Sequence, residues 1–400
     1  MARIFDSLNV IDCASFIAAP AAATILSDFG ADVIKIEPPG TGDAYRATYA
    51  AAGQPSCEEN YPWILDARNK RSLAIDLANA EGRAILAQLV AQADVFITNY
   101  PAAVRAKLGI RYDDLAGLNE RLVYASFSGY GERGEEAAKP GFDTTAWWAR
   151  SGLMGTVRSN AQTPPARSVG GMGDHPSSLA LFAGIVMALY KRQQTGRGTE
   201  VASSLLANGA WANSFMAQAA LCGATFHPRP PREEALNAFA NHYQCRDGLW
   251  LVFSIHNEER QWPALAQALE RPDLLADPRF ATKADRLANV HALIAAFDAA
   301  FITRDRADWR ARLNARGIIF DIVAMPEDIA SDRQMRENEI VVPFADSATL
   351  TIASPIALRG ETKVQPKLPP ALGQHSDEIL RELGVDEAGI ARLRASGVIA

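Results

Sequence analysis

The sequence has little cysteine and no spaced set of metal ligands. Its four cysteines, Cys13, Cys57, Cys222 and Cys245, are spread over 400 residues without a CxxC pair, and its six histidines form no HExxH motif. A disulfide framework and a zinc site both depend on such spacings. We therefore expect neither of them, and no bound metal.

Long charged runs and long apolar runs are also missing. The 40 basic and 46 acidic residues give a net charge of −6, and no lysine- or arginine-rich segment offers the positive surface that nucleic acids require. No apolar run reaches the roughly 18 residues of a membrane span, and the N-terminal segment lacks the basic start and apolar stretch of a secretion signal. With 48% hydrophobic residues, the composition predicts a cytoplasmic globular enzyme without a nucleic-acid or membrane partner.

The glycine-rich loops that bind phosphates are absent as well. The first predicted strand-to-helix turn, CASFIAAP (13–20), contains no glycine, so the GxGxxG turn of dinucleotide-binding enzymes cannot form there. Glu37 ends the second predicted strand, where such enzymes carry a ribose-binding acid. Because the glycines are missing, Glu37 fits a solvated strand end as well as it fits a ribose-binding acid. The sequence therefore argues against a nicotinamide-dependent dehydrogenase.

What the sequence does contain is a repeated alternation of strands and helices. Short apolar runs that fit buried strands are separated by segments with helical periodicity. The expected strands are 8–14, 31–37, 71–77, 94–100 and 121–130. Strands that alternate with helices in this way predict an α/β fold with a doubly wound, Rossmann-like parallel sheet.

One carboxylate stands between a glycine stretch and a long apolar helix. Asp174 follows Gly170, Gly171 and Gly173 and precedes Pro176, at the start of a helix expected to reach residue 194. Aspartate in this place commonly caps the free N–H groups of a first helical turn, and proline suits the same turn. The alternative is a nucleophilic carboxylate. The stretch alone favours the cap and leaves the nucleophile open.

Seven segments of the chain, in order, resemble the class III CoA-transferases, also called the CaiB/BaiF family, which include the 2-methylacyl-CoA racemases. They are residues 10–46, RNKRSLAIDL (68–77), DVFITNYPAAVRAKLGI (94–110), YASFSGYG (124–131), PGFDTTAWWARSGLM (140–154), residues 170–201 and LGQHSDEIL (372–380). The resemblance covers nearly the whole chain.

The resemblance assigns Asp174 the position of the catalytic carboxylate of the family. Its attack on an acyl-CoA thioester would give a mixed anhydride, and the released thiolate would then form an aspartyl-CoA thioester. The acceptor, a carboxylic acid, reverses these steps. Because the energy of the thioester is conserved, the resemblance implies no metal, no ATP and no tightly bound cofactor, with coenzyme A entering as the acyl-CoA substrate.

The resemblance also supplies candidate contacts to coenzyme A, whose phosphates need cations and whose pantetheine arm needs an extended groove. These candidates are Ser15, Phe16, Ala18, Lys70, Arg71, Asn99, Tyr100, Lys107 and Lys139. Many relatives carry a basic residue where this chain has Pro38, and Arg46 is the candidate replacement for that phosphate contact.

A change of composition at HPRPPREEALN (227–237) indicates a domain boundary. By resemblance, the large CoA-binding domain comprises residues 1–205 and is completed by 340–400. A linker (206–227), a small α+β domain (228–330) and a return segment (331–400) follow. The family forms homodimers of two chains interlocked as linked rings, and we expect the same here.

Other activities stay open beside the transfer of CoA from an acyl-CoA to a carboxylic acid. The racemases need a base on each side of the substrate carbon and carry histidine where this chain has Phe142, which argues against racemisation. An intramolecular isomerase of the mesaconyl-CoA type and an acyl-CoA-binding module without activity are further alternatives. An apolar acyl pocket or ordinary core packing would account equally for Trp147, Trp148, Trp211, Phe215 and Met216. The acyl donor and the acceptor acid are not identified.

Overall fold

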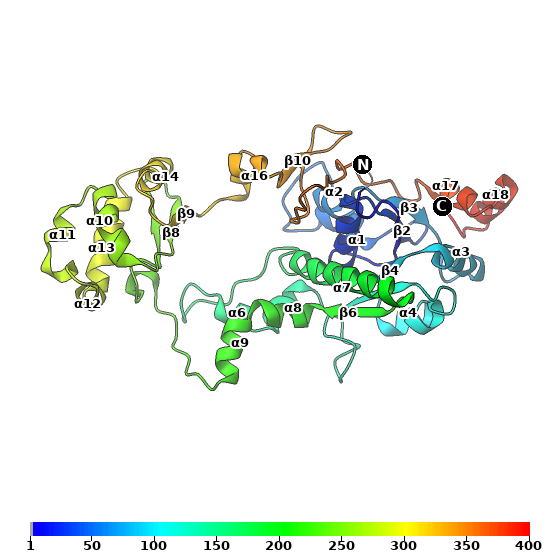
Figure 1. Ribbon diagram of the computed structural model, residues 1–400, viewed down its shortest axis with the longest axis horizontal. Coiled ribbons are helices and arrows are strands. Elements are labelled where there is room, and N and C mark those ends of the chain that lie inside the picture. The colour runs from blue at the N-terminus through cyan, green and yellow to red at the C-terminus, as the bar shows by residue number, and fades with distance from the viewer. Residues whose placement is uncertain (1–2) are drawn as a thin grey trace. The chain divides into compact units, whose positions relative to one another are not determined.

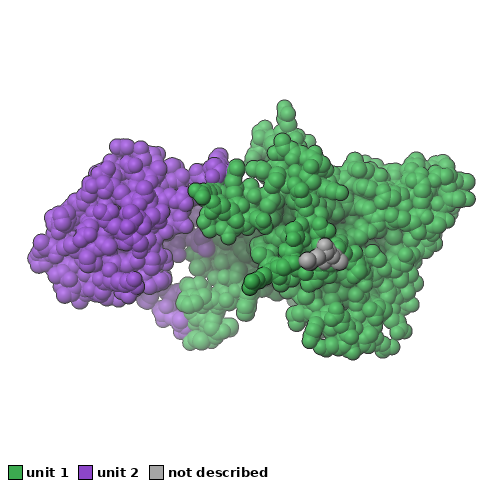
Figure 2. Space-filling model, turned by 45° about the horizontal axis from the view of Figure 1, so that its top comes forward, with its two compact units in different colours: residues 1–156, 167–222, 332–400 green, residues 157–166, 223–331 purple. Residues whose placement is uncertain are grey.

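A computed structural model describes residues 3–400 of the chain, which divide into two compact units. The first unit comprises the described residues up to 156, residues 167–222 and residues 332–400. The second comprises residues 157–166 and 223–331. Figure 2 shows the two units in different colours.

A six-stranded parallel sheet forms the centre of the first unit (Figure 1). Its strands are β1 (Asn9–Asp12), β2 (Asp32–Glu37), β3 (Arg71–Ala74), β4 (Val95–Thr98), β5 (Val123–Ser128) and β6 (Glu200–Ser204). They are arranged in the order β3-β2-β1-β4-β5-β6, and every neighbouring pair is parallel. The predicted α/β fold with a parallel sheet is confirmed. Because the strand order reverses between β1 and β4, a crevice forms beyond the carboxyl ends of these two strands.

Helices cover both faces of this sheet, because successive strand residues point to opposite sides. Val95 of β4 belongs to the core beneath α1 (Ala18–Asp28) and α7 (Asp174–Thr195), which lie side by side (Figure 1). The next residue, Phe96, belongs to the core beneath α3 (Ala80–Gln92) on the other face. The two cores hold β1 and β4 rigidly, so the residues that follow these strands are well placed for a binding site.

The end of the chain packs on β3 as part of the first unit. Helices α17 (Ser376–Glu382) and α18 (Glu387–Ala395) contribute to the same core as α3. The Ser376 hydroxyl accepts a hydrogen bond of 3.2 Å from the Ala74 N–H, and Ile399 pairs with Ile75 as an isolated bridge.

The remaining elements of the first unit are shorter and connect these layers. They are the 3₁₀ helix η1 (Ala44–Ala50), α2 (Tyr61–Asp66), α4 (Ala102–Leu108), α5 (Tyr112–Leu115), the π-helical η2 (Asp143–Ala149), α6 (Leu153–Thr156), α8 (Leu205–Ala212), α9 (Ser214–Leu221), α16 (Arg333–Glu337), β10 (Val341–Pro343) and β11 (Leu350–Ile352). Across residues 3–400, no helix combines the length and the apolar character that crossing a membrane requires.

The second unit is built on a three-stranded antiparallel sheet of β7 (His242–Gln244), β8 (Trp250–Phe253) and β9 (Phe320–Ile322). Its helices are η3 (Arg232–Glu234), α10 (Glu258–Ala268), α11 (Asp273–Ala276), η4 (Pro278–Phe280), α12 (Lys283–Ala288), α13 (Val290–Phe301), α14 (Arg306–Asn314) and α15 (Pro326–Ile329). An aromatic core holds them together, in which Phe301 contacts both Tyr243 and Trp309.

Candidate active site

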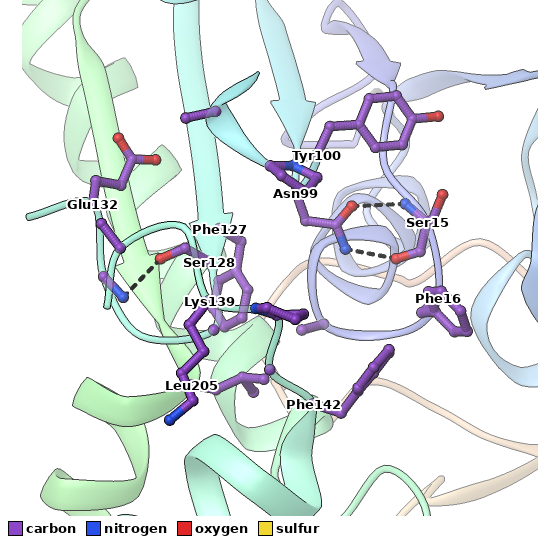
Figure 3. A pocket seen from close by; sticks show the side chains of 18 of the residues that line it. Ser15, Phe16, Asn99, Tyr100, Phe127, Ser128, Glu132, Lys139, Phe142 and Leu205 are labelled. Atoms are coloured by element: carbon purple, nitrogen blue, oxygen red, sulfur yellow. Dashed lines mark hydrogen bonds between the residues drawn. The ribbon is translucent and has the colours of Figure 1, made fainter. Parts of the chain in front are cut away.

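A cavity of about 490 Å³ lies at the carboxyl ends of β1 and β4 in the first unit (Figure 3). Its wall consists of residues that follow β1 and β4, of the end of β5 and the turn after it, of the loop 137–142, of Leu205 after β6, and of Asp174 at the start of α7. Ligands of doubly wound sheets bind where the strand order reverses, and small-molecule sites measure roughly 300–1,000 Å³. Position and size together make this cavity the candidate active site.

The loop after β1 is fixed by Asn99, which follows β4. The Asn99 Oδ1 accepts a hydrogen bond of 2.8 Å from the Ser15 N–H, and its Nδ2 donates one of 2.6 Å to the Ser15 carbonyl (Figure 3). The next residue, Phe16, has a φ of +62°, a left-handed conformation that residues with a Cβ seldom adopt. Its N–H donates to the Asp43 carboxylate at 3.3 Å. These contacts hold a strained loop open along one wall of the cavity.

Asp174 is the first residue of α7, and its side chain lines the cavity. Within residues 3–400 its carboxylate accepts no hydrogen bond from the chain. Burial, with the nearby Asp143 and Asp66 carboxylates, raises the pKa of Asp174 from 3.8 to about 7, while the charge of His175 acts in the opposite direction. A partly buried carboxylate without a partner is poised to react with a ligand.

The glycines before Asp174 make room for two rings. A Cβ at Gly173 would lie 2.5 Å from Trp147 Cγ, and a Cβ at Gly171 would lie 2.7 Å from the His175 ring, whereas nothing stands within 4 Å of a Cβ at Gly170. The backbone before α7 therefore packs directly on aromatic side chains, and this contact sets where the helix begins.

His175 lies on the other side of the helix start, in contact with Asp66 at the end of α2. Its Nε2 is 3.0 Å from Asp66 Oδ1, and its Nδ1 is 3.1 Å from the Gly171 carbonyl oxygen. The second oxygen of Asp66 accepts a hydrogen bond of 2.8 Å from the Tyr45 hydroxyl. Asp66 and Tyr45 are buried. The start of α7 is thus tied to α2 and η1.

The cavity brings together seven of the ten sequence-predicted site residues, and three do not line it. Those that line it are Ser15, Phe16, Ala18, Asn99, Tyr100, Lys139 and Asp174. Lys139 is exposed, forms an ion pair of 2.8 Å with Glu136, and stacks over the Tyr130 ring.

Lys70 is one of the three, and its environment argues against a direct contact with coenzyme A. Its side chain is fully buried, and its Nζ donates to Asp12 Oδ2 at 2.9 Å and to the Pro20 carbonyl at 2.8 Å. Desolvation by burial, only partly offset by the Asp12 charge, lowers the pKa of Lys70. A neighbouring buried lysine, Lys35, forms an ion pair of 2.9 Å with Asp43. Lys70 supports the first loop from beneath, so we remove it from the candidate phosphate contacts.

Arg71 and Lys107 also lie away from the cavity lining. The Arg71 guanidinium forms ion pairs with Asp32, with Glu378 at 3.0 Å and with Glu382 at 2.8 Å, so its charge is already neutralised. Lys107 is exposed on α4, the helix whose residue Arg105 does line the cavity. We therefore remove Arg71 from the candidate contacts and retain Lys107 as a candidate outside the cavity.

The interpretation of Glu37 as a solvated strand end is wrong. Glu37 is buried, and both of its oxygens accept hydrogen bonds of 2.7 Å from Arg46. Arg46 also stacks over the Trp63 ring at 4.0 Å. Because its guanidinium is occupied in this way, Arg46 is a poor replacement for the missing phosphate contact at Pro38.

Sequence reasoning missed two charged residues of the site. Arg105 is buried, lines the cavity and forms an ion pair of 2.8 Å with Glu132. Asp143, at the start of η2, is buried near Asp174, and its Oδ2 has no hydrogen-bond partner. Asp143 lies next to Phe142 in the segment PGFD, so its position in a family motif is the signal that could have found it. Nothing in the sequence distinguished Arg105 from a surface arginine.

The tryptophans divide into two groups. Trp147 and Trp148 are buried and stacked, with ring centroids 6.1 Å apart, so they pack in the core. Trp211 and Phe215, on α8 and α9, are 80% and 85% exposed in the single chain. These four side chains do not line the cavity. Among the described residues, no group of three or more His, Cys, Asp or Glu side chains is arranged to hold a metal ion.

Comparison with known proteins confirms the resemblance seen in the sequence. The family model described as CoA-transferase family III matches residues 5–376. The (R)-2-hydroxy-4-methylpentanoate CoA-transferase of Clostridioides difficile is 31% identical, over 99% of this chain and 99% of that protein. The cinnamoyl-CoA:phenyllactate CoA-transferase of Clostridium sporogenes is 32% identical, over 98% of this chain and 96% of that protein.

The fold agrees with these matches. The crystal structure of a CaiB/BaiF family protein from Brucella suis superposes with a TM-score of 0.86 at 26% identity, covering 96% of this chain and 100% of that one. The family match and the two relatives extend over nearly the whole chain. The chain therefore belongs to CoA-transferase family III and is an enzyme that transfers CoA between acyl-CoA thioesters and carboxylic acids.

Proposed function

We propose that Asp174 is the nucleophile of this transfer and that the reaction takes place in the cavity beyond β1 and β4. The observation that carries the proposal is that the Asp174 carboxylate lines the cavity and accepts no hydrogen bond within residues 3–400. A carboxylate that served only as a helix cap would accept one from a first-turn N–H. The unpartnered carboxylate is free to attack a bound thioester.

The transfer then proceeds through three covalent states of Asp174, a mixed anhydride with the donor acid, a thioester with CoA and a mixed anhydride with the acceptor acid. Its carboxylate attacks the thioester carbonyl, the CoA thiolate leaves, and a mixed anhydride forms. The thiolate attacks the aspartyl carbonyl of the anhydride, which releases the donor acid and leaves an aspartyl-CoA thioester. The acceptor carboxylate attacks the aspartyl carbonyl of this thioester, which releases the thiolate and forms a second mixed anhydride. The thiolate then attacks the acceptor acyl carbonyl of that anhydride, the new acyl-CoA forms, and the Asp174 carboxylate leaves unmodified.

Coenzyme A would bind along the wall formed by the loops after β1 and β4. Ser15, Phe16, Ala18, Asn99 and Tyr100 surround this part of the cavity and suit the pantetheine arm. The phosphates would bind the exposed cations at the rim.

Lys139 is the candidate at the rim of the cavity, and Lys107 is the candidate beyond it. Lys139→Ala and Lys107→Ala are expected to raise KM for acyl-CoA more than they lower kcat, with a dependence on salt concentration. An unchanged KM in both variants would reject this assignment.

The names of the relatives indicate which acids to test first. Four relatives are named for 2-hydroxy acids: the two described above and two CoA-transferases of Chloroflexus aurantiacus, one for L-malate at 32% identity and one for D-citramalate at 30% identity. We propose a 2-hydroxy acid with an aliphatic or aromatic side chain as the acceptor, because a cavity that combines polar loop ends with Phe16 and Phe142 suits such a molecule. A panel of acyl-CoA donors and labelled acids tests this choice.

The experiment for the nucleophile is the substitution Asp174→Asn. Asparagine keeps the shape of the side chain and a hydrogen-bond acceptor, so a mere cap would survive at a cost of about 1 kcal/mol or less. We expect a folded protein that binds acyl-CoA and transfers nothing. Transfer at a near-native rate would exclude Asp174 as the nucleophile.

The same assay separates the alternative activities. Exchange of the substrate's α-proton without CoA transfer would indicate a racemase, although Phe142 at the cavity offers no group that exchanges a proton. Movement of CoA within one molecule, without exchange into a labelled acid, would indicate an isomerase. Binding without either reaction would indicate a binding module.

We further propose a cytoplasmic homodimer of two interlocked chains, in which the first unit is the CoA-binding domain and the second the small domain. Trp211, Phe215 and Leu221 on α8 and α9 are at least 80% exposed in the single chain, and such apolar surface is typical of an interface. Light scattering during dilution is expected to give a dimer until the protein unfolds. A folded monomer at low concentration would contradict this.

A further inference from the structure

The His175 ring lies between two hydrogen-bond acceptors. Its Nε2 is 3.0 Å from the Asp66 carboxylate, and its Nδ1 is 3.1 Å from the Gly171 carbonyl oxygen. A neutral imidazole carries one N–H, so only one of these contacts could be a hydrogen bond. The imidazolium carries two N–H groups and satisfies both acceptors. The geometry therefore favours the charged form of His175.

The surroundings of Asp66 favour a positive charge on His175. It is buried, and its Oδ2 already accepts a hydrogen bond of 2.8 Å from Tyr45. Lys70 binds the Asp66 backbone carbonyl at 2.9 Å rather than its carboxylate. An ionised carboxylate in such a place needs a cation beside it, and His175 supplies one through Oδ1.

Gly171 provides the space that the ring needs. Its φ is +76°, and a Cβ there would lie 2.7 Å from the Cε1 and Nδ1 atoms of His175. A side chain at this position would push the ring away from the Gly171 carbonyl and from Asp66. The glycine turn before α7 and the Asp66 contact thus fix the ring from both sides.

We propose that His175 is held as an imidazolium by Asp66 and the Gly171 carbonyl, and that its positive charge favours the ionised form of the adjacent Asp174 carboxylate, the form that attacks the thioester. His175 is then a positioning residue that acts through Asp174, and the inference rests on the proposed nucleophilic role of Asp174. Without such a charge, Asp174 would face burial and two neighbouring carboxylates, Asp66 and Asp143, all of which favour its protonated form.

The other groups around the ring agree with this assignment. Burial by itself would lower the pKa of His175, but the hydrogen bond and the charge of Asp66 outweigh it, and Gly171 and Asp174 add to the increase. The open side of the ring, 40% of its side-chain surface, faces a second cavity of about 630 Å³, which Arg68, Glu339 and Lys363 also line. Arg68 is paired with Asp28 at 2.6 Å.

The first test compares two variants of His175 in the pH dependence of kcat/KM for acyl-CoA. His175→Gln keeps an amide donor for Asp66 but removes the charge, and His175→Lys keeps the charge. Since an adjacent opposite charge lowers a carboxyl pKa by about 1–3 units and the ring is partly open to solvent, we expect His175→Gln to move the acid limb upward by about one pH unit. The acid limb of His175→Lys is expected to stay close to that of the unaltered enzyme. Equal limbs in the two variants would overturn the proposal.

The second test observes the ring itself in the unaltered enzyme, and variants serve only to assign its resonances. In the full chain labelled with ¹⁵N-histidine, the resonances lost in His175→Gln, or in His175→Asn if that variant fails to fold, identify His175. Both ring nitrogens are expected to show imidazolium shifts at about pH 7, above the midpoint of an ordinary histidine. A neutral single tautomer at that pH would overturn the proposal. Transfer by Asp174→Asn would instead contradict the nucleophile and leave this NMR result unaffected, so the two failures are distinguishable.

Discussion

Replacing Asn99 with alanine removes both hydrogen bonds that hold the Ser15 backbone, of 2.8 and 2.6 Å, while the strands beneath stay intact. Each bond contributes about 1 kcal/mol net, so the loop loses about 2 kcal/mol of support. Phe16 has a φ of +62°, and this left-handed conformation itself costs about 1–2 kcal/mol. Without the Asn99 hydrogen bonds, we expect the Phe16 backbone to relax to a negative φ.

The relaxed loop would close or distort the wall along which coenzyme A is proposed to bind. A shift of about 2 kcal/mol toward a relaxed loop lowers the apparent affinity by at most about 30-fold. We therefore expect Asn99→Ala to lower kcat/KM for acyl-CoA by up to this factor, mainly through KM, with little change in the rate at which the acceptor acid reacts with the aspartyl-CoA thioester.

Asn119→Ala is the matched control. The Asn119 side chain likewise binds only backbone groups: its Nδ2 donates to the carbonyls of Val90 at 3.1 Å and Ala93 at 2.7 Å, and its Oδ1 accepts from the Arg121 N–H at 2.9 Å. It does not line the cavity, so Asn119→Ala should lower the free energy of unfolding by at least as much as Asn99→Ala and leave kcat/KM unchanged. If Asn99→Ala lost stability but kept its kcat/KM, the Asn99 clamp would have no part in binding coenzyme A.

Two more predictions follow from the start of α7. Gly173→Ala would place a Cβ 2.5 Å from Trp147 Cγ, so we expect the free energy of unfolding to fall by about 1–3 kcal/mol and the transfer activity to fall with it. Gly170→Ala is the control, because a Cβ there meets nothing within 4 Å. It should change neither quantity in the same denaturation and transfer assays. Folding raises the pKa of Asp174 from 3.8 to about 7, so ionising this carboxyl destabilises the folded protein. Below about pH 4 the group is protonated in both states and the destabilisation is absent; above about pH 7 it is present in full. Asp174→Asn should therefore raise Tm at about pH 8 and leave it unchanged at about pH 4, and an equal effect at both values would refute the raised pKa.

The sheet could be predicted because its signal is local. Runs such as VIDC and VFIT are mostly apolar, with one polar residue each, as expected for strands covered on both faces, and the parallel sheet followed from the helices between them. The ends of the strands were predicted less accurately. The first strand was expected over 8–14 and is Asn9–Asp12, because the residues after it turn into the loop that Asn99 holds.

The environment of single charged residues could not be predicted in the same way. Whether a lysine faces solvent depends on the carboxylates that the fold brings to it, and Lys70 meets Asp12 from 58 positions away. His175 and Asp66 are 109 positions apart and come together only because α2 packs near the start of α7. The position of Asp174 was found from the resemblance of its segment, since the local pattern alone favoured a cap.

The most direct test of the central claim is to trap the covalent state of Asp174. The enzyme is incubated with acyl-CoA, treated with hydroxylamine and digested with trypsin, which releases residues 168–191 as one peptide whose only acidic residue is Asp174. Hydroxylamine displaces CoA from an aspartyl thioester and leaves a hydroxamate on the side chain. We predict that this peptide changes in mass only when acyl-CoA is present, and that the Asp174→Asn protein shows no change. An unmodified peptide from an enzyme that is turning over would contradict the covalent mechanism.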